Sequence, residues 1–258
     1  MKFTDYPTKD GILTITLFSW ADFCSLVGKL KVWPDYKKYV WRGQRCDNLP
    51  LLSTFDRTFK VKDENERKLI LDNHLERFKK TCNELGINKD KEGNELWSIG
   101  QHNGLLPPFL DWTKCPFVAG FFAFAEKEEK DQTEYRVVYG LHKGLRRLLR
   151  KMKTSKGTIN KKRFVEFPPV RTNGNRRLEK QKSLFTKALN GVDIENNVRK
   201  YVKKRPQEII LIKIKIPDRE RDECLKSLND RGINHVTLFP DDYGSAKFCN
   251  LKLEIDNY

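Results

Sequence analysis

Five side chains that can donate or accept a hydrogen bond lie close together near the middle of the chain. The segment at 117–125 follows them directly and is the most apolar part of the sequence. Polar groups beside so dry a helix must be hydrogen-bonded, because each buried group without a partner costs roughly 1–3 kcal/mol. We therefore expect them to form one wall of a pocket. They are Gln101, His102, Asp111, Trp112 and Thr113.

A second group able to do chemistry, Arg42-Gly43-Gln44, follows a segment at 36–41 that is predicted to be a strand. An arginine where an inner strand meets a loop can hold a phosphate or a carboxylate through two hydrogen bonds. The same arginine could instead pair with a buried acid, and these residues alone favour neither interpretation. Gly43 would allow the backbone to turn sharply or to approach a ligand closely.

Cysteines and histidines are scattered along the chain. The six cysteines show no C-x-x-C spacing and the four histidines are dispersed, whereas zinc sites need paired ligands at short spacing. We therefore expect no structural metal. A nucleophile built from Cys115 and His102 is conceivable, but reduced cysteines without a catalytic role are the interpretation that we adopt.

Charge is the clearest compositional signal. The 258-residue chain has 51 Lys and Arg against 35 Asp and Glu, a net charge of +16. Such a charge attracts polyanions, here RNA, DNA or a nucleotide cofactor, although it also serves solubility alone. Its uneven distribution favours a binding face. Residues 143–163 are rich in lysine and arginine and contain no acid, so we expect a basic insert that contacts nucleic acid, with a solvated mobile loop as the alternative.

The sequence also bears on location. No apolar run approaches the roughly 18 residues that a membrane-spanning helix needs, and the N-terminal residues lack the pattern of a signal peptide. We expect a cytoplasmic protein without a membrane partner.

The elements that position the polar groups alternate between helix and strand. Ser19 and Asp22 form the pattern of a capping box before apolar residues at helical spacing, and Pro116 suits the first turn of a helix. Further helices are expected at 64–85, 193–202, after 217 and at the C-terminus, strands at 14–18, 109–113, 136–141, 209–216 and 236–239, and a loop at 51–58. The pattern predicts an α+β fold, one compact domain over 1–258 with 143–163 as its basic insert.

Four blocks of sequence, in order, resemble those of the FRG domain family. The first is Trp41-Arg42-Gly43-Gln44. The second combines Gln-His-x-Gly at 101–104, Leu-Asp-Trp-Thr at 110–113 and an apolar helix that starts with proline. The third lies at 177–185 and the fourth at 232–244. Two positions depart from the family pattern: Pro108 stands where an arginine is usual, which removes one expected anion contact, and Ser183 stands where a glycine is usual.

The order of these blocks is similar to that of the ADP-ribosyltransferase superfamily. The resemblance implies a central, split mixed or antiparallel sheet flanked by helices, and NAD as the substrate. It places Arg42 on the NAD phosphate or ribose, and Gln181 where many transferases have a glutamate. The residues implicated in holding NAD are Arg42, Gly43, Gln44, Gln101, Trp112 and Arg177, and those implicated in catalysis are Arg42, His102, Asp111, Thr113 and Gln181.

The presence of a glutamine at position 181 has a chemical consequence. Cleavage of the nicotinamide glycosidic bond develops positive charge on the ribose, which an oriented carboxylate stabilises and a glutamine amide does not. Another acid would have to supply that charge, and the candidates are Glu166, Glu179, Glu208 and Asp111.

Two functions are compatible with these observations. The first is an enzyme similar to mono-ADP-ribosyltransferases or an NAD hydrolase, acting as a toxin or antiphage effector on nucleic acid or a nucleic-acid-bound protein, with an antitoxin as a possible partner. The second is a non-catalytic module that binds a nucleotide or RNA through the same pocket and the basic face. The enzyme is favoured, because a polar pocket packed on a dry helix is a costly arrangement for surface binding alone.

Overall fold

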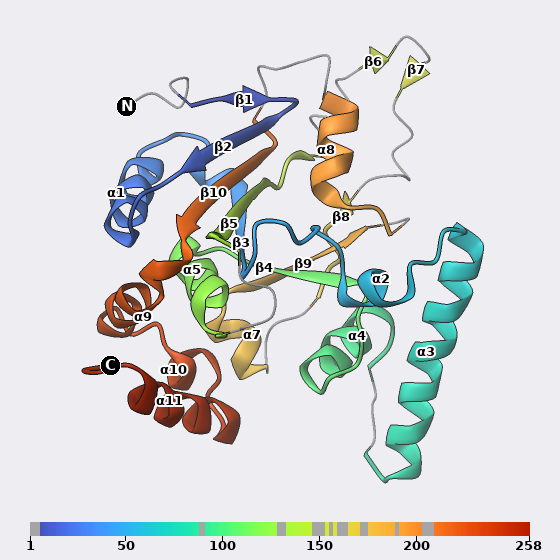
Figure 1. The fold of residues 1–258 in the computed structure, drawn as a ribbon. Coiled ribbons are helices and arrows are strands. Elements are labelled where there is room, and N and C mark those ends of the chain that lie inside the picture. The colour runs from blue at the N-terminus through green and yellow to red at the C-terminus, as the bar shows by residue number, and fades with distance from the viewer. Residues whose placement is uncertain are drawn as a thin grey trace.

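A mixed sheet of eight strands forms the centre of the computed structural model, with helices against both of its faces (Figure 1). The structure describes residues 6–87, 91–127, 133–145, 153–154, 157–158, 165–170, 175–188, 191–202 and 209–258. The strand order is β1 (Thr8–Lys9), β2 (Ile12–Thr16), β10 (Leu211–Pro217), β5 (Tyr135–His142), β3 (Tyr39–Gln44), β4 (Phe109–Thr113), β9 (Ser183–Ala188) and β8 (Val165–Glu166). Within it, β2 and β10 are parallel and the other neighbours are antiparallel. The predicted α+β class is confirmed.

The larger apolar core lies on the face covered by α1 (Trp20–Lys31), α5 (Pro116–Phe124), α9 (Arg221–Asp230) and α11 (Asp242–Glu254). The local sequence explains where two of these helices begin. Ser19 accepts a hydrogen bond from the backbone N–H of Asp22, as its capping pattern predicts, and Pro116 is the first residue of α5. Helix α5 is buried along most of its length, so it joins the sheet to the remaining helices on this face.

The opposite face packs against α8 (Ile194–Val202), whose Ile194, Val198 and Val202 are fully buried. A third cluster joins α2 (Thr54–Phe59), α3 (Glu64–Glu84) and α4 (Gly93–His102) to β4 and β9, through residues such as Phe55, Trp97 and Phe109. In Figure 1 these three helices lie to the right of the sheet, opposite α9, α10 (His235–Leu238) and α11.

The sheet divides between β3 and β4. Only Trp41 and Thr113 pair across these two fully described strands. On its outer side β3 pairs with β5 from Tyr39 to Gln44, and β4 pairs with β9 over its whole length. The strands therefore diverge on one side of the Trp41–Thr113 pair and leave a fork there.

Three expectations about local structure are wrong. Residues 51–58 are not all loop, because Ser53 accepts from the N–H of Asp56 and starts α2. Residues 236–239 do not form a strand, because Asn234 and Thr237 make a reciprocal capping box that starts the short helix α10. Arg42 lies within a strand rather than at its end, because residues 36–38 form a 3-10 turn that shifts β3 toward the C-terminus.

Most of the expected basic insert at 143–163 lies outside the described residues. Within it, Lys153–Thr154 and Gly157–Thr158 pair as the small hairpin β6–β7, and 143–145 directly follow β5. Among the helices that the structure describes, none is both long enough and apolar enough to span a bilayer.

Candidate functional site

A cleft with a volume of about 690 Å³ opens at the fork between β3 and β4. Its walls come from both strands, from α4 and the loop that follows it, from α5 and α7 (Arg176–Lys180), and from the turn before α11. Gln44 is not among the lining residues. The other predicted site residues all line the cleft: Arg42, Gly43, Gln101, His102, Asp111, Trp112, Thr113, Arg177 and Gln181.

Arg42 crosses the fork. Its Nη1 donates to the backbone oxygen of Asp111 at 2.9 Å, where the two strands no longer pair through their own backbones. Its buried Nε has no hydrogen-bond partner among the described residues. Burial lowers the pKa of the guanidinium, the nearby Asp111 opposes that shift, and the positive charge of Arg57 adds to it. Arg42 is thus a cation held beside the cleft with donor capacity to spare.

Asp111 supplies a carboxylate to the same cleft. The side chain is open to the cleft, yet protein atoms surround it closely enough that burial raises the pKa of its carboxyl group. Arg42, His102 and a hydrogen bond from Gln101 each oppose this shift. The Gln101 amide donates to Oδ1 at 2.5 Å, the Asp111 backbone N–H also favours the charged carboxylate, and within the described part of the chain no side chain donates to Oδ2. One carboxylate oxygen therefore remains for a ligand.

His102 is the last residue of α4, and the turn after it needs a left-handed residue that Gly104 provides at φ +90°. Burial lowers the pKa of the imidazole, Asp111 opposes the shift and Arg177 adds to it. The ring is therefore neutral at neutral pH. Its Nε2 has no hydrogen-bond partner among the described residues.

Gly43 faces helix α5 rather than a turn. A Cβ atom at this position would lie 1.9 Å from the backbone oxygen of Ala119 and 2.5 Å from the backbone nitrogen of Ala123. The missing side chain is thus what lets α5 pack directly on β3, and so helps to set the wall of the cleft.

Four predicted site residues make side-chain hydrogen bonds within the protein. The Trp112 indole donates to Thr186 at 2.8 Å, and Thr113 accepts from the N–H of Cys115 at 3.1 Å. Gln181 donates to the backbone oxygen of Leu238 at 3.1 Å, and Gln44 donates to that of Leu49. These contacts hold the walls in place.

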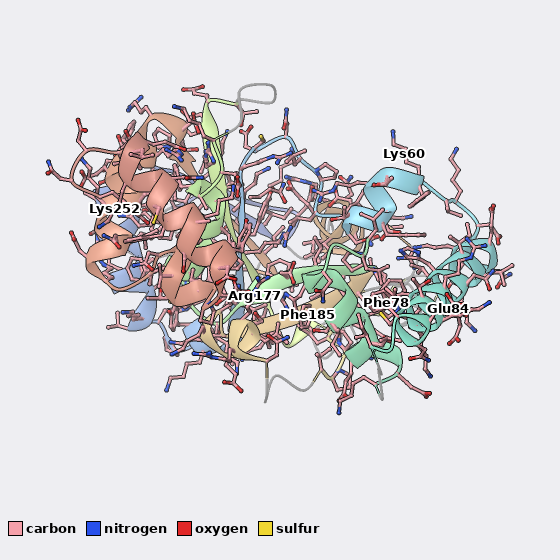
Figure 2. The ribbon with its side chains drawn as sticks, turned by 90° about the horizontal axis from the view of Figure 1, so that it is seen from below. Lys60, Phe78, Glu84, Arg177, Phe185 and Lys252 are labelled. Carbon is pink, nitrogen blue, oxygen red and sulfur yellow. The ribbon has the colours of Figure 1, made fainter. Side chains whose placement is uncertain are left out.

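Sequence reasoning missed the aromatic wall of the cleft. Phe122, Phe239 and Tyr243 line it, and Tyr243 is 44% exposed. The Arg177 guanidinium lies over the rings of Phe239 and Tyr243, 5.5 and 5.7 Å from their centroids, and its Nε donates to Asp241. Figure 2 shows Arg177 near the middle of the molecule seen from below, between the C-terminal helices and α4. Phe239 lies in the fourth sequence block at 232–244, but the strand expected at 236–239 gave no indication that its side chain faces a ligand.

The candidate acids are placed differently. Asp111 lines the cleft, whereas Glu166 lies on the edge strand β8 opposite Lys187 and Glu179 lies on α7 outside the lining. Glu208 falls outside the described residues. Among the residues that the structure describes, no three histidine, cysteine or acidic side chains converge to hold a metal ion.

The fold and the cleft define an α+β protein with a polar, arginine-bearing site at a divided sheet. Residues 37–132 match the family model of the FRG domain. The chain therefore contains an FRG domain over these residues, which include β3, β4, α5 and both sides of the fork. No curated protein and no solved structure matches the chain.

Proposed function

We propose that the cleft binds NAD and that the protein is an enzyme similar to mono-ADP-ribosyltransferases. In this proposal it is a cytoplasmic toxin or antiphage effector, its target is nucleic acid or a nucleic-acid-bound protein, and an antitoxin could restrain it. The observation that carries the proposal is the pairing, within one cleft, of a half-buried cation, whose Nε is buried without a partner among the described residues, with an available carboxylate. Arg42 and Asp111 stand on opposite sides of the fork.

Arg42 supports the binding of a phosphate-bearing ligand. Its Nε is buried without a partner among the described residues, and Arg57 is near enough to repel it. Two cations placed together are stabilised by an anion between or beside them, and a guanidinium binds phosphate through two parallel hydrogen bonds. The pyrophosphate of NAD is such an anion.

Asp111 supports the chemistry. In the proposed reaction the bond between C1′ of the ribose and the nicotinamide nitrogen breaks, and its electron pair leaves with nicotinamide. An acceptor oxygen then forms a bond to C1′, and its proton passes to a base and on to solvent. A fixed carboxylate stabilises the positive charge that builds up on the ribose and can take that proton. The free Oδ2 of Asp111 suits both roles.

The positions of the other acids support the same assignment. Gln181 is uncharged, and its amide donates to the backbone oxygen of Leu238 at the end of α10. Glu166 and Glu179 do not line the cleft. Asp111 is the acid that the cleft offers among its described lining residues, and we assign it the part that a glutamate has in many transferases.

One observation favours the second candidate function, a module that binds a nucleotide without turnover. The Asp111 carboxylate accepts a hydrogen bond from Gln101, which acts to lower its pKa against the effect of burial and so weakens it as a base for proton abstraction. Arg42, the aromatic wall and the volume of the cleft would serve binding equally well.

The experiment that tests the proposal incubates the full-length protein with NAD labelled in its adenylate part, alone and with cellular RNA, DNA or protein. Nicotinamide release and label transfer are both measured. Asp111→Asn keeps the size of the side chain and removes its charge, and we expect it to lower the rate about 10²- to 10³-fold. Glu166→Gln and Glu179→Gln are matched controls and should react as the wild type does.

Each outcome bears on the proposal. Transfer to one class of acceptor supports a transferase, and release without transfer supports an NAD hydrolase. NAD binding without any release supports the binding module. An Asp111→Asn variant that folds and reacts as fast as the two controls would refute the role of Asp111, and a wild type that neither binds nor cleaves NAD would refute the proposal.

A further inference from the structure

A second hollow adjoins the cleft. It has a volume of about 390 Å³ and shares His102 and Arg177 with the cleft, so the two spaces meet at these side chains. Its other lining residues are Asn103, Asn175, Arg176, Pro240 and Asp241. With the exception of Pro240 all are polar or charged, whereas aromatic and aliphatic side chains contribute much of the wall of the cleft.

A single turn of chain separates the two spaces. Phe239 and Tyr243 face the cleft, while Pro240 and Asp241 between them face the hollow. Arg177 touches both spaces, lies over both rings and is fixed by its ion pair with Asp241. The Lys247 ammonium also lies over the Tyr243 ring, 5.9 Å from its centroid. Aromatic rings and cations therefore lie side by side along this border, and the Tyr243 ring is exposed.

Arg176 provides the cation of the hollow. It is exposed, and no hydrogen bond or ion pair joins it to another described residue. Arg177 is neutralised by Asp241, so Arg176 is the lining cation whose charge remains for a ligand.

We propose that this border binds a single strand of nucleic acid that serves as the acceptor of the reaction. The inference rests on the proposed function for its acceptor role, but the binding itself does not require NAD. Proteins that bind single strands combine cations for the phosphates with exposed aromatic rings on which bases stack. Arg176 contacts a phosphate in the hollow, and a base stacks on Tyr243.

The shared residues explain why such a strand would react. A strand in the hollow lies next to His102, which is neutral at neutral pH and stands at the junction with the cleft that holds Asp111. An acceptor group on the strand can pass its proton to the Asp111 carboxylate across this junction as its new bond to C1′ forms. A duplex would not fit the scheme, because its bases are already stacked on one another and unavailable to Tyr243.

The test measures binding by fluorescence anisotropy without NAD, using labelled single-stranded RNA and DNA of about twelve nucleotides and the matching duplexes. Tyr243→Ala should weaken single-strand binding about 5- to 100-fold, and Tyr243→Phe should keep most of the affinity. Arg176→Ala should weaken binding and reduce the slope of log K against log salt by about 0.7, the value of one phosphate contact to a single strand.

Two variants serve as matched controls. Lys252→Ala removes an exposed cation that lies over a ring, as Lys247 does, but Lys252 lines neither hollow and is seen toward the left edge of the molecule in Figure 2, away from Arg177 near the middle. Phe18→Ala removes an exposed aromatic ring that lines neither hollow. Both should bind single strands like the wild type, apart from a small general effect of charge.

The inference is overturned if Tyr243→Ala and Arg176→Ala bind as the controls do, or if duplexes bind as tightly as single strands. It is also overturned if the wild type binds neither strand at low salt, and label transfer to protein alone would then identify a protein acceptor. Single-strand binding in a protein that leaves NAD intact would refute the proposed function and the acceptor role, while the binding site itself would stand.

Discussion

Replacing Gly43 by alanine is expected to destabilise the protein strongly. A Cβ at this position would lie 1.9 Å from the Ala119 oxygen and 2.5 Å from the Ala123 nitrogen, and both atoms belong to the backbone of α5. A backbone cannot rotate aside as a side chain can, so the buried helix must move away from β3. Overpacking of a core costs roughly 1–3 kcal/mol, and this contact belongs at or above the upper limit. We expect a loss of about 3 kcal/mol.

Gly28 provides the matched control. It lies within α1, and a Cβ atom there would meet nothing within 4 Å. Glycine inside a helix is less favourable than alanine by roughly 0.5–1 kcal/mol, so Gly28→Ala should stabilise the protein by about that amount. The same Gly→Ala substitution is therefore expected to lower the free energy of unfolding at position 43 and to raise it at position 28.

Urea unfolding followed by circular dichroism measures both variants against the wild type, with equal m-values as the condition for comparing midpoints. A loss of about 3 kcal/mol should also lower the melting temperature by roughly 6 °C in a chain of this size. If Gly43→Ala lost less than about 1 kcal/mol, then close packing of α5 would not be the reason for a glycine here. The alternative, that Gly43 admits a ligand, would then predict weakened NAD binding with unchanged stability.

Two further predictions concern buried ionisable side chains. Asp56 and Arg67 form an ion pair in which Nε and Oδ1 are 2.6 Å apart and both side chains are 4% exposed. Asp56→Asn should therefore lower the free energy of unfolding by about 3–5 kcal/mol, measured in urea. Glu84→Gln, in the exposed pair with Lys80, should lower it by less than about 1 kcal/mol, and equal losses would refute the reasoning. Burial lowers the pKa of His235 to about 4, below its unfolded value of about 6.5, so the unfolded chain binds more protons between these values and stability falls with acid. Between pH 7 and about pH 5, the free energy of unfolding of His235→Phe should therefore fall by about 2 kcal/mol less than that of the wild type, and equal decreases would contradict a lowered pKa at His235.

Elements with a strong local signal were predictable from the sequence. The helices that start at Ser19 and Pro116 and the strand ending at Pro217 follow from capping, proline position and alternation. Two short helices were missed although signals for them exist: Ser53 with Asp56, and Asn234 with Thr237, each fit a cap with its partner three residues on. At 236–239 the apolar composition outweighed that signal.

The site was predictable in its residues but not in its geometry. Motifs identified Arg42, His102 and Asp111, and the cleft brings them together. The fork that creates the cleft depends on which strands pair, which no local window contains. The same holds for the contact of Gly43 with α5, and for Tyr243, whose place in the wall is fixed by an arginine 66 positions earlier in the chain, Arg177.

The fork between β3 and β4 also determines how the molecule should open locally. Amides where two strands part lack partners across the gap, so they exchange with solvent through small fluctuations rather than global unfolding. Each side keeps its outer neighbour, β5 or β9, and can act as a separate cooperative unit. A ligand that bridges Arg42 and Asp111 would tie the units together and slow amide exchange in both at once. A ligand confined to one wall would slow exchange on that side alone, so the exchange pattern distinguishes the two modes of binding.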